Sequence, residues 1–365
     1  MNISLFELSR LIEEHRDSLV CAFENCIDHS RFIMGPDIAA FEDIFSGKVG
    51  ANYCVSSSSG TDALLSIFMA LDLEPGSEIL VPSFTFIASA SSIIRAGLKP
   101  IFVDLAPDSF HPSCDTIKGA WTKRTKGVLF AHLFGEPEDL SEIKELCDER
   151  GAVLVEDCAQ SYGSTAGRTG LASAYSFFPA KNLGCLGDGG AVTTDDLGFA
   201  KKLKTVRTHG SSVKYNYELL GGNFRMDTIQ AAFLSVLLEH ADLWIERRRE
   251  NAAYYNDCLK GIEGLALPKD CEGHAWNQYT VRASQRDALK NHLDDNNIGN
   301  AIYYPIPLHN SSNIFGNCNS LPETDKRCKE VLSIPVYPGL KKIEREFIVD
   351  KIKEFFDDTS YCKYL

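Results

Sequence analysis

The chain has 365 residues, of which 44% are hydrophobic and 24% are charged, so its composition is that of a soluble globular protein and excludes disordered and fibrous classes. At about 150 residues per domain, this length predicts two domains, or one large domain with an appendage. The chain carries 37 lysines and arginines and 50 aspartates and glutamates, and the net charge of −13 argues against binding to nucleic acid or to an anionic membrane.

Short β-rich runs alternate with helical patterns between about residues 52 and 192. A serine-rich turn at 56–60 follows the first run, and a helical pattern from Leu64 to Leu71 follows the turn. Further strands are predicted near 79–81, 101–104, 128–133 and 152–155, and helices near 89–96 and 137–150. Apolar strands that alternate with helices predict a parallel sheet with helices on both faces, which is an α/β sandwich.

The pattern changes after Asn223. One long helix is predicted from about 227 to 260, and a smaller α/β unit follows it, with strands near 278–281 and 301–304 and helices near 287–296 and 341–356. The long helix is the natural bridge between two domains. We therefore predict a large domain over residues 1–240 and a small C-terminal domain over residues 241–365.

Neither a membrane span nor a secretory signal is predicted. No run of about 18 uninterrupted apolar residues occurs, and the N-terminal residues carry a charge every few positions. The 12 cysteines, of which the last is Cys362, stand singly without a CxxC pair, so we expect reduced thiols and no metal site. These features predict a cytoplasmic protein.

Ligands bind at the carboxyl ends of the strands in an open parallel sheet, so residues that follow strands are the first candidates for a site. The turn at 56–61 opens a helix, and its Gly60 and Thr61 suit a phosphate, because free backbone N–H groups and a hydroxyl lie at the helix N-terminus. An ordinary serine or threonine N-cap explains the same residues. Neither a GxxxxGK[ST] motif nor a GxGxxG motif after a strand occurs, so the sequence does not support those nucleotide sites.

Three further residues complete a pattern. Asp157 ends an apolar strand, where a buried carboxylate needs a cation such as a protonated ring nitrogen. Alternatively, Asp157 caps a helix. Lys181 lies among apolar and small residues, where desolvation favours the neutral amine that forms a Schiff base, although a structural or surface lysine also fits. Phe86 suits stacking on a flat cofactor or packing in the core. Together with the phosphate turn, these are the parts of a pyridoxal phosphate site.

Long motifs carry a resemblance to a known family. With the segments VLVEDCAQSYGS, SFFPAKNLGCLGDGGAV and GGNFRMDTIQAAFL, the chain resembles the DegT/DnrJ/StrS family of nucleotide-sugar aminotransferases over nearly its whole length. The resemblance implies dependence on pyridoxal 5′-phosphate. It also implies an aspartate-aminotransferase-like α/β fold (fold type I), with a mainly parallel sheet between helices in the large domain and a smaller C-terminal α/β domain. In this family the N-terminal segment packs with the small domain.

The resemblance implies catalytic roles for two residues. Lys181 matches the lysine that holds the cofactor as a Schiff base and moves the proton, and Asp157 matches the partner of the pyridine nitrogen. Gln160 matches the residue beside the 3′-oxygen of the ring, and Phe86 matches the aromatic residue that stacks on the ring.

The resemblance also implies the phosphate contacts. Gly60, Thr61 and Ser176 match residues that bind the cofactor phosphate within one chain. Asn223 matches a residue that reaches the phosphate of the neighbouring subunit. The implied assembly is therefore a homodimer with shared active sites, and no metal is implied.

The implied reaction transfers an amino group from L-glutamate to a nucleotide-linked keto-sugar, for cell-surface polysaccharide or other amino-sugar biosynthesis. Relatives that act on 3-keto sugars tend to carry KNLG, GDGG and YPIP elements, which occur here at 181–184, 187–190 and 304–307. This pattern indicates amination at C3 of a dTDP- or UDP-linked sugar. A 4-keto substrate is the alternative, and a non-catalytic regulatory relative is disfavoured because Lys181, Asp157 and Gln160 are all present.

Two polar residues are candidates for substrate contacts. Arg225 suits an anionic group of the donor or the sugar, or a salt bridge at an interface. His309 follows the YPIPL element and suits a contact with the sugar, or a position in a surface loop.

Overall fold

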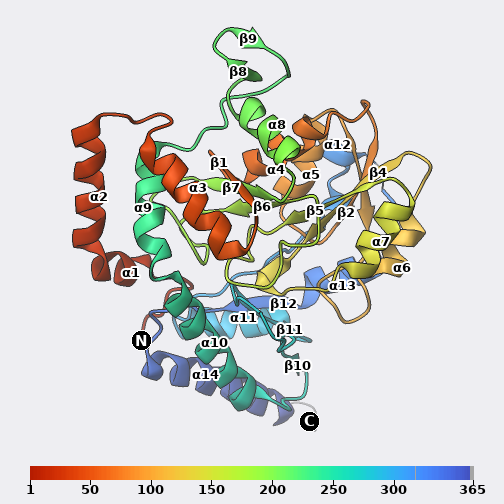
Figure 1. Cartoon of the computed structure of the whole chain (residues 1–365). Coiled ribbons are helices and arrows are strands. Elements are labelled where there is room, and N and C mark those ends of the chain that lie inside the picture. Colours follow the sequence, from red (N-terminus) through yellow and green to blue (C-terminus); the bar gives the residue numbers. More distant parts are fainter. Residues whose placement is uncertain (317, 362–365) are drawn as a thin grey trace.

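A seven-stranded sheet forms the centre of the computed structural model, which describes residues 1–316 and 318–361 (Figure 1). The strand order is β1-β7-β6-β5-β4-β2-β3. The strands are β1 (Tyr53–Ser57), β2 (Glu78–Pro82), β3 (Lys99–Val103), β4 (Thr125–Ala131), β5 (Val153–Asp157), β6 (Ala172–Ser176) and β7 (Gly190–Thr194). Strand β7 runs antiparallel to both of its neighbours, and the pairings from β6 to β3 are parallel. The predicted α/β fold with a mainly parallel sheet is therefore confirmed.

Helices cover both faces of this sheet, because successive strand residues point to opposite sides. Ile79 and Val81 pack in a cluster with α4 (Gly60–Leu71), α5 (Ile87–Arg95) and α8 (Leu197–Arg207). Leu80 packs in a different cluster with α6 (Cys114–Ala120) and α7 (Ser141–Glu149). Strands that are apolar on both sides are what a sheet buried on both faces requires.

The N-terminal helices form a further layer at the β1 end of the sheet (Figure 1). They are α1 (Leu8–Glu14), α2 (Arg16–His29) and α3 (Pro36–Val49), and α2 and α3 pack on α9 (Thr228–Leu238). Phe41 and Phe45 of α3 contact Phe177, which directly follows β6, with ring centroids 5.5 and 5.1 Å apart. This aromatic cluster joins the helical layer to the segment that carries Lys181.

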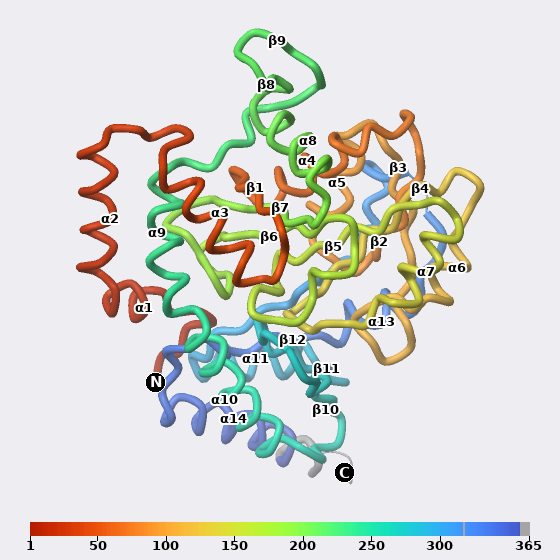
Figure 2. Tube along the Cα trace, viewed as in Figure 1, coloured from red at the N-terminus to blue at the C-terminus, as the bar shows by residue number. Residues whose placement is uncertain are grey.

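A second, three-stranded antiparallel sheet belongs to the C-terminal part, with β10 (Leu265–Ala266), β11 (Tyr279–Ala283) and β12 (Val331–Ile334). It packs with α10 (Ala241–Leu259), α11 (Arg286–Asp295) and α14 (Lys342–Tyr361). Ile3 lies in the same core and bridges to Ile298, and Figure 2 shows the N-terminal end of the trace beside this unit. The remaining elements are short: η1 (Leu133–Gly135), β8 (Ser211–Val213), β9 (Asn216–Tyr217), η2 (Leu308–Asn310), α12 (Ser312–Phe315) and α13 (Pro322–Glu330).

The bridge between the two sheets differs from the expected single helix. The region forms two helices, α9 and α10, and His240 lies at the N-cap of the second with its ring stacked on His15 at 4.0 Å. Helix α10 serves both cores, since Trp244 packs with the helical layer and Tyr255 packs with the second sheet. The division at residue 240 stays a prediction. The strand expected near 301–304 is reduced to a single bridge between Ala301 and Ser333.

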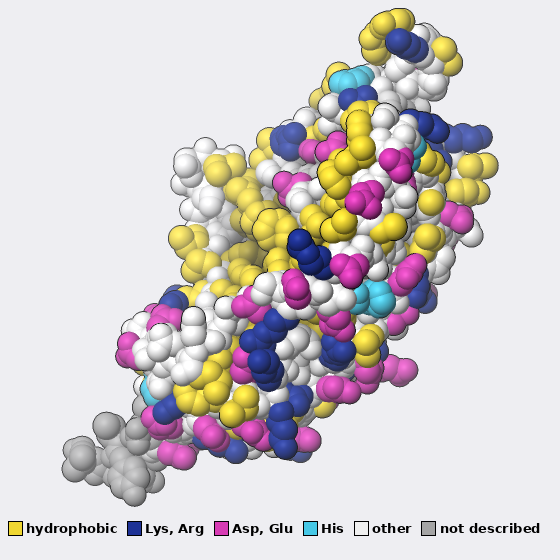
Figure 3. Space-filling view, turned by 90° about the vertical axis from the view of Figure 1, so that its left-hand side faces the viewer, with side chains coloured by type: hydrophobic (Ala, Val, Ile, Leu, Met, Phe, Trp, Pro, Cys, Tyr) yellow, Lys and Arg dark blue, Asp and Glu magenta, His cyan; other side chains and the backbone are white. Residues whose placement is uncertain are grey.

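Apolar side chains are exposed on the face that carries α2. They come from α2, the segment after it and α3: Val20, Phe23, Ile27, Phe32, Ile33, Met34 and Ile44. Figure 3 shows hydrophobic side chains gathered in the upper half of this face. No helix in the described ranges is long and apolar enough to cross a membrane. Every cysteine up to Cys328 is free of disulfides, and Cys362 lies outside the described residues.

Candidate active site

A cavity of about 430 Å³ lies at the carboxyl ends of β4 and β5. Seven of the residues predicted from the sequence line it, namely Gly60, Thr61, Phe86, Asp157, Gln160, Ser176 and Lys181. Phe6, Gln278, Tyr303 and Tyr304 close it from distant parts of the chain. The fold thus gathers residues from the whole chain around one space.

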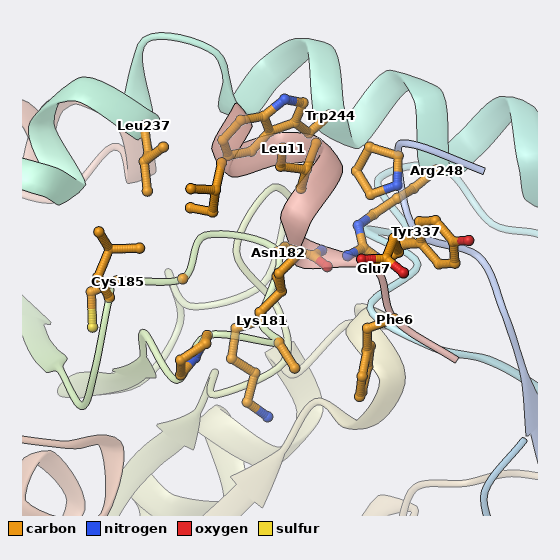
Figure 4. Close-up of a pocket in the computed structure, with 17 residues that line it drawn as sticks. Phe6, Glu7, Leu11, Lys181, Asn182, Cys185, Leu237, Trp244, Arg248 and Tyr337 are labelled. Carbon is orange, nitrogen blue, oxygen red and sulfur yellow. The ribbon is translucent and has the colours of Figure 1, made fainter. Parts of the chain in front are cut away.

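Lys181 lies in the segment between β6 and β7. Its backbone N–H donates to the Phe178 carbonyl at 2.8 Å, which forms a tight turn. Figure 4 shows the side chain directed away from Leu237 and Trp244, which line a neighbouring cavity of about 320 Å³. Burial lowers the pKa of Lys181 to about 8, against the opposing effect of the Asp157 carboxylate. A large share of the amine is therefore neutral and nucleophilic near pH 8.

Asp157 is the last residue of β5 and is buried. Ser89 Oγ donates to Oδ2 at 2.7 Å, and the Ala159 N–H donates to Oδ1 at 3.1 Å. Burial raises the pKa of Asp157, and these two bonds and the Lys181 charge oppose the shift. The carboxylate is held in one orientation, and it lacks an ion-pair partner among the described residues, so a cation in the cavity would be favoured there.

The N-terminus of α4 forms a cradle beside Lys181. Ser59 caps the helix by accepting from the Asp62 N–H at 3.1 Å. A Cβ on Gly60 would lie 2.7 Å from the Ser176 Cβ, so only glycine lets the helix end and β6 approach this closely. The cradle offers hydroxyls and the first helical N–H groups, which suits a phosphate.

Aromatic and amide groups form the remaining wall. Phe86 is 55% exposed although it lines a cavity, so one face of its ring is available for stacking. The Tyr304 ring lies 6.2 Å from it, and Gln160 Nε2 donates to the Tyr304 hydroxyl at 3.5 Å. Gln160 Oε1 accepts from the Phe134 N–H, which fixes the amide.

The turn η1 connects this wall to the second sheet. Phe134 has a positive φ of 62°. Its carbonyl accepts from the Asn277 N–H at 2.8 Å, and the Gly135 carbonyl accepts from the Ala275 N–H at 2.9 Å. Asn182, next to Lys181, donates to the Ala275 carbonyl at 2.8 Å. Two backbone hydrogen bonds and one from the Asn182 side chain therefore hold the second unit against the cavity.

Three predicted residues lie outside the cavity lining. Asn223 is exposed in the single chain, and Arg225 has a buried Nε without a hydrogen-bond partner. His309 is only 6% exposed, because Ser83 Oγ lies 2.8 Å from its Nδ1 and Asp325 lies 3.4 Å from its Nε2. The roles given to these three residues stay predictions.

Several lining residues were not predicted. Phe6 and Gln278 have no local motif, and they reach the cavity only through the packing of the N-terminal segment and the second sheet. Tyr304 stands in the YPIP element, where the aromatic residue itself was the available signal. His132, directly after β4, lines the cavity, and its Nε2 lies at hydrogen-bond distance, 2.9 Å, from Glu156 Oε2.

The cavity fits pyridoxal phosphate on the chemistry of its donors. A partly neutral amine, a buried carboxylate, a glycine cradle and a free aromatic face correspond to the aldehyde, the ring nitrogen, the phosphate and the ring of that cofactor. When bound, the cofactor supplies an electron sink for reactions at the carbon that carries the amino group.

Comparisons with known proteins point the same way. The model of the DegT/DnrJ/EryC1/StrS aminotransferase family matches residues 14–353. A pleiotropic regulatory protein of Geobacillus stearothermophilus is 37% identical, covering 98% of this chain and 99% of that protein. The dTDP-3-amino-3,4,6-trideoxy-alpha-D-glucose transaminase of Streptomyces venezuelae is 36% identical, covering 97% and 96%. The structure of S. venezuelae DesV in complex with a ketimine intermediate superimposes with a TM-score of 0.94 at 35% identity, over 97% of this chain and 98% of that one.

Proposed function

We propose that this chain, which belongs to the DegT/DnrJ/EryC1/StrS aminotransferase family, transfers an amino group from L-glutamate to C3 of a nucleotide-linked keto-sugar. The enzymes of this family depend on pyridoxal phosphate. The observation that carries the proposal is that Lys181 and Asp157 line one cavity, with burial lowering the pKa of Lys181 to about 8. A transaminase needs both an amine that reacts at neutral pH and a carboxylate for the ring nitrogen.

Each lining residue has a proposed task. Lys181 would hold the cofactor through its amine, and the same amine would carry a proton to or from the reacting carbon. Asp157 would keep the ring nitrogen protonated, and Ser89 holds Asp157 in position. Phe86 would stack on the ring, and Gln160 would hold the ring oxygen.

The phosphate is proposed to lie in the α4 cradle, bound by Gly60, Thr61 and Ser176. The close contact of Gly60 with Ser176 supports this placement, because it brings a helix N-terminus and a hydroxyl to one point. Anionic charge at a helix N-terminus is stabilised by the helix dipole.

A homodimer with shared active sites is proposed from two features. The exposed apolar side chains of α2, 32–34 and α3 form one face, which suits a second copy of this chain. Asn223 is exposed in the single chain, as expected of a residue that completes the partner's site.

Amination at C3 is supported by the KNLG, GDGG and YPIP elements and by the 3-amino sugar in the name of the S. venezuelae relative. The alternative is a 4-keto sugar. The name of the G. stearothermophilus relative favours a regulatory role as a second candidate, but a regulator has no need of a reactive lysine in the cavity.

An absorbance titration tests the proposal. The purified protein with pyridoxal phosphate should show the band of the lysine-bound cofactor, and L-glutamate should convert it to the band of the amine form. Lys181→Ala should bind the cofactor without the first band and without turnover. The amine-form protein is then offered dTDP- and UDP-linked 3-keto and 4-keto sugars. A protein that L-glutamate leaves unchanged would contradict the donor assignment, and turnover by Lys181→Ala would contradict the site.

A further inference from the structure

A second group of potential ligands lies outside the cofactor cavity. His111 stands in the loop between β3 and α6, and Glu136 and Glu138 stand in the segment between η1 and α7. One nitrogen of the histidine and one oxygen of each glutamate all lie within 4.8 Å of one another. Both loops lie at the carboxyl ends of parallel strands, so the fold brings the three side chains together.

The imidazole of His111 is buried without a hydrogen bond. It is 2% exposed, and neither ring nitrogen has a hydrogen-bond partner in the structure. Its nearest polar contact is the long separation of 3.5 Å between Nδ1 and Glu138 Oε1. A desolvated donor or acceptor without a partner is costly, so this side chain points to a ligand in the group.

The two carboxylates surround the same point. Glu136 is only 4% exposed, and one of its carboxylate oxygens lies within 4.8 Å of one of Glu138. Two carboxylates so close repel each other unless a cation or a proton lies between them.

The cation that now compensates Glu138 is easily displaced. Lys269 Nζ lies 3.4 Å from Glu138 Oε1, and its side chain is 59% exposed. An exposed lysine holds such a pair weakly. Glu138 itself is 27% exposed and lines a small cavity of about 110 Å³, which gives an ion a route from solvent.

Two other groups of this type in the described residues differ from the group at His111. In the group of Cys26, His29 and Asp37, both ring nitrogens of His29 are engaged, with Asp37 at 3.1 Å and with the Arg31 N–H at 3.0 Å. In the group of His132, Glu156 and Cys158, His132 Nδ1 is also buried without a partner, but the single carboxylate already accepts from the imidazole and from three backbone N–H groups. Of the three groups in the described residues, the group at His111 alone combines two carboxylates with a buried imidazole that makes no hydrogen bond through either nitrogen.

We propose that His111, Glu136 and Glu138 bind one divalent transition-metal ion of the Zn²⁺ type, with water completing the coordination. Imidazole and carboxylate ligands suit Zn²⁺, and metal–ligand distances of about 2.0–2.2 Å require the three atoms to move somewhat closer together. The ion joins the loop after β3 to the segment after η1, so it stabilises the fold and takes no part in amino transfer. The absence of CxxC pairs predicted no metal site, but this group contains no cysteine.

A calorimetric titration with Zn²⁺ tests the proposal on the cofactor-loaded protein after treatment with a chelator. The wild type should bind one ion per chain with high affinity. His111→Gln and Glu138→Gln should each weaken binding at least tenfold. His29→Gln makes the same change in the group whose nitrogens are already engaged, and it should leave the affinity unchanged. Lys269→Ala should strengthen binding, because it removes a competing cation.

Two further measurements separate this site from adventitious binding. Thermal unfolding without metal shows whether His111→Gln is folded, and if it is not, the partly exposed Glu138→Gln decides the question. Co²⁺ bound at the site should lack the near-ultraviolet charge-transfer band of a cobalt thiolate. Such a band, an equal loss of affinity in His29→Gln, or unchanged affinity in Glu138→Gln would overturn the proposal.

Discussion

The pKa of Lys181 is the property on which the proposed chemistry depends most directly. With a pKa of about 8, the amine of the cofactor-free protein is neutral in about 10% of molecules at pH 7, whereas an ordinary lysine is neutral in about 0.04%. The difference is about 200-fold in the reactive species. Between pH 7 and 9 the reactivity of Lys181 should rise about tenfold and then level off, whereas that of an ordinary lysine rises about 100-fold over the same range.

Brief acetylation of the cofactor-free protein with acetic anhydride measures this profile. Mass spectrometry of the peptide that contains Lys181 gives its rate of modification from pH 6 to pH 10, and exposed lysines in the same digest serve as the reference. Reactivity should reach half of its plateau near pH 8. A rate that still climbs tenfold per pH unit above pH 9 would refute the desolvation argument.

The variant Asp157→Asn tests in which direction the Asp157 charge shifts the pKa of Lys181. The carboxylate raises the pKa of Lys181 and burial lowers it, so removing the charge with a side chain of the same shape should move the midpoint below pH 8. More of the amine would then be neutral at pH 7, although the variant should be a poor transaminase because the ring nitrogen has lost its partner. An unchanged or higher midpoint would show that the two side chains do not interact across the cavity.

Two further predictions concern the cofactor. Gly60→Ala places a methyl group against Ser176, so the affinity of this variant for pyridoxal phosphate should fall at least tenfold in a fluorescence titration. The control is Gly47→Ala, whose added methyl group has nothing within 4 Å and which should bind the cofactor like the wild type. Equal affinities of the two variants would show that the phosphate does not bind in the cradle. For shared sites, mixing Lys181→Ala chains with Asn223→Ala chains should restore activity at limiting cofactor, up to about a quarter of wild-type sites, because each mixed dimer contains one intact site. Failure of the mixture to exceed the sum of its components would place Asn223 in its own chain's site.

Much of the site could be predicted because its signals are local. Asp157 is a charged residue at the end of an apolar strand, and Gly60 lies at the start of a helix that follows a strand. In both cases a short stretch of sequence shows the secondary-structure element and also the residue that departs from its pattern. The parallel order of the sheet then brings such positions to one edge.

The remaining part depends on contacts that no window contains. Phe6 reaches the cavity because Ile3 is anchored in the core of the second sheet, more than 250 residues away in sequence. No proline or glycine marks the break between α9 and α10 in the sequence. At this break His240 packs on His15, a contact between residues far apart in sequence. His309 is taken out of solvent by Ser83, a partner that its own neighbours in sequence do not reveal.

The bonds at η1 have a consequence for how substrates are chosen. A hinge motion that moves the two sheets apart would break three hydrogen bonds, each worth about 1 kcal/mol. They run from Asn277 to Phe134, from Ala275 to Gly135 and from Asn182 to Ala275. The last of these lies one residue from the reactive lysine, so such a motion would also displace the amine. We therefore expect the entrance of the cofactor cavity to keep a fixed width. A sugar that is too large would then be excluded by steric clash, because the two sheets do not move apart to admit it.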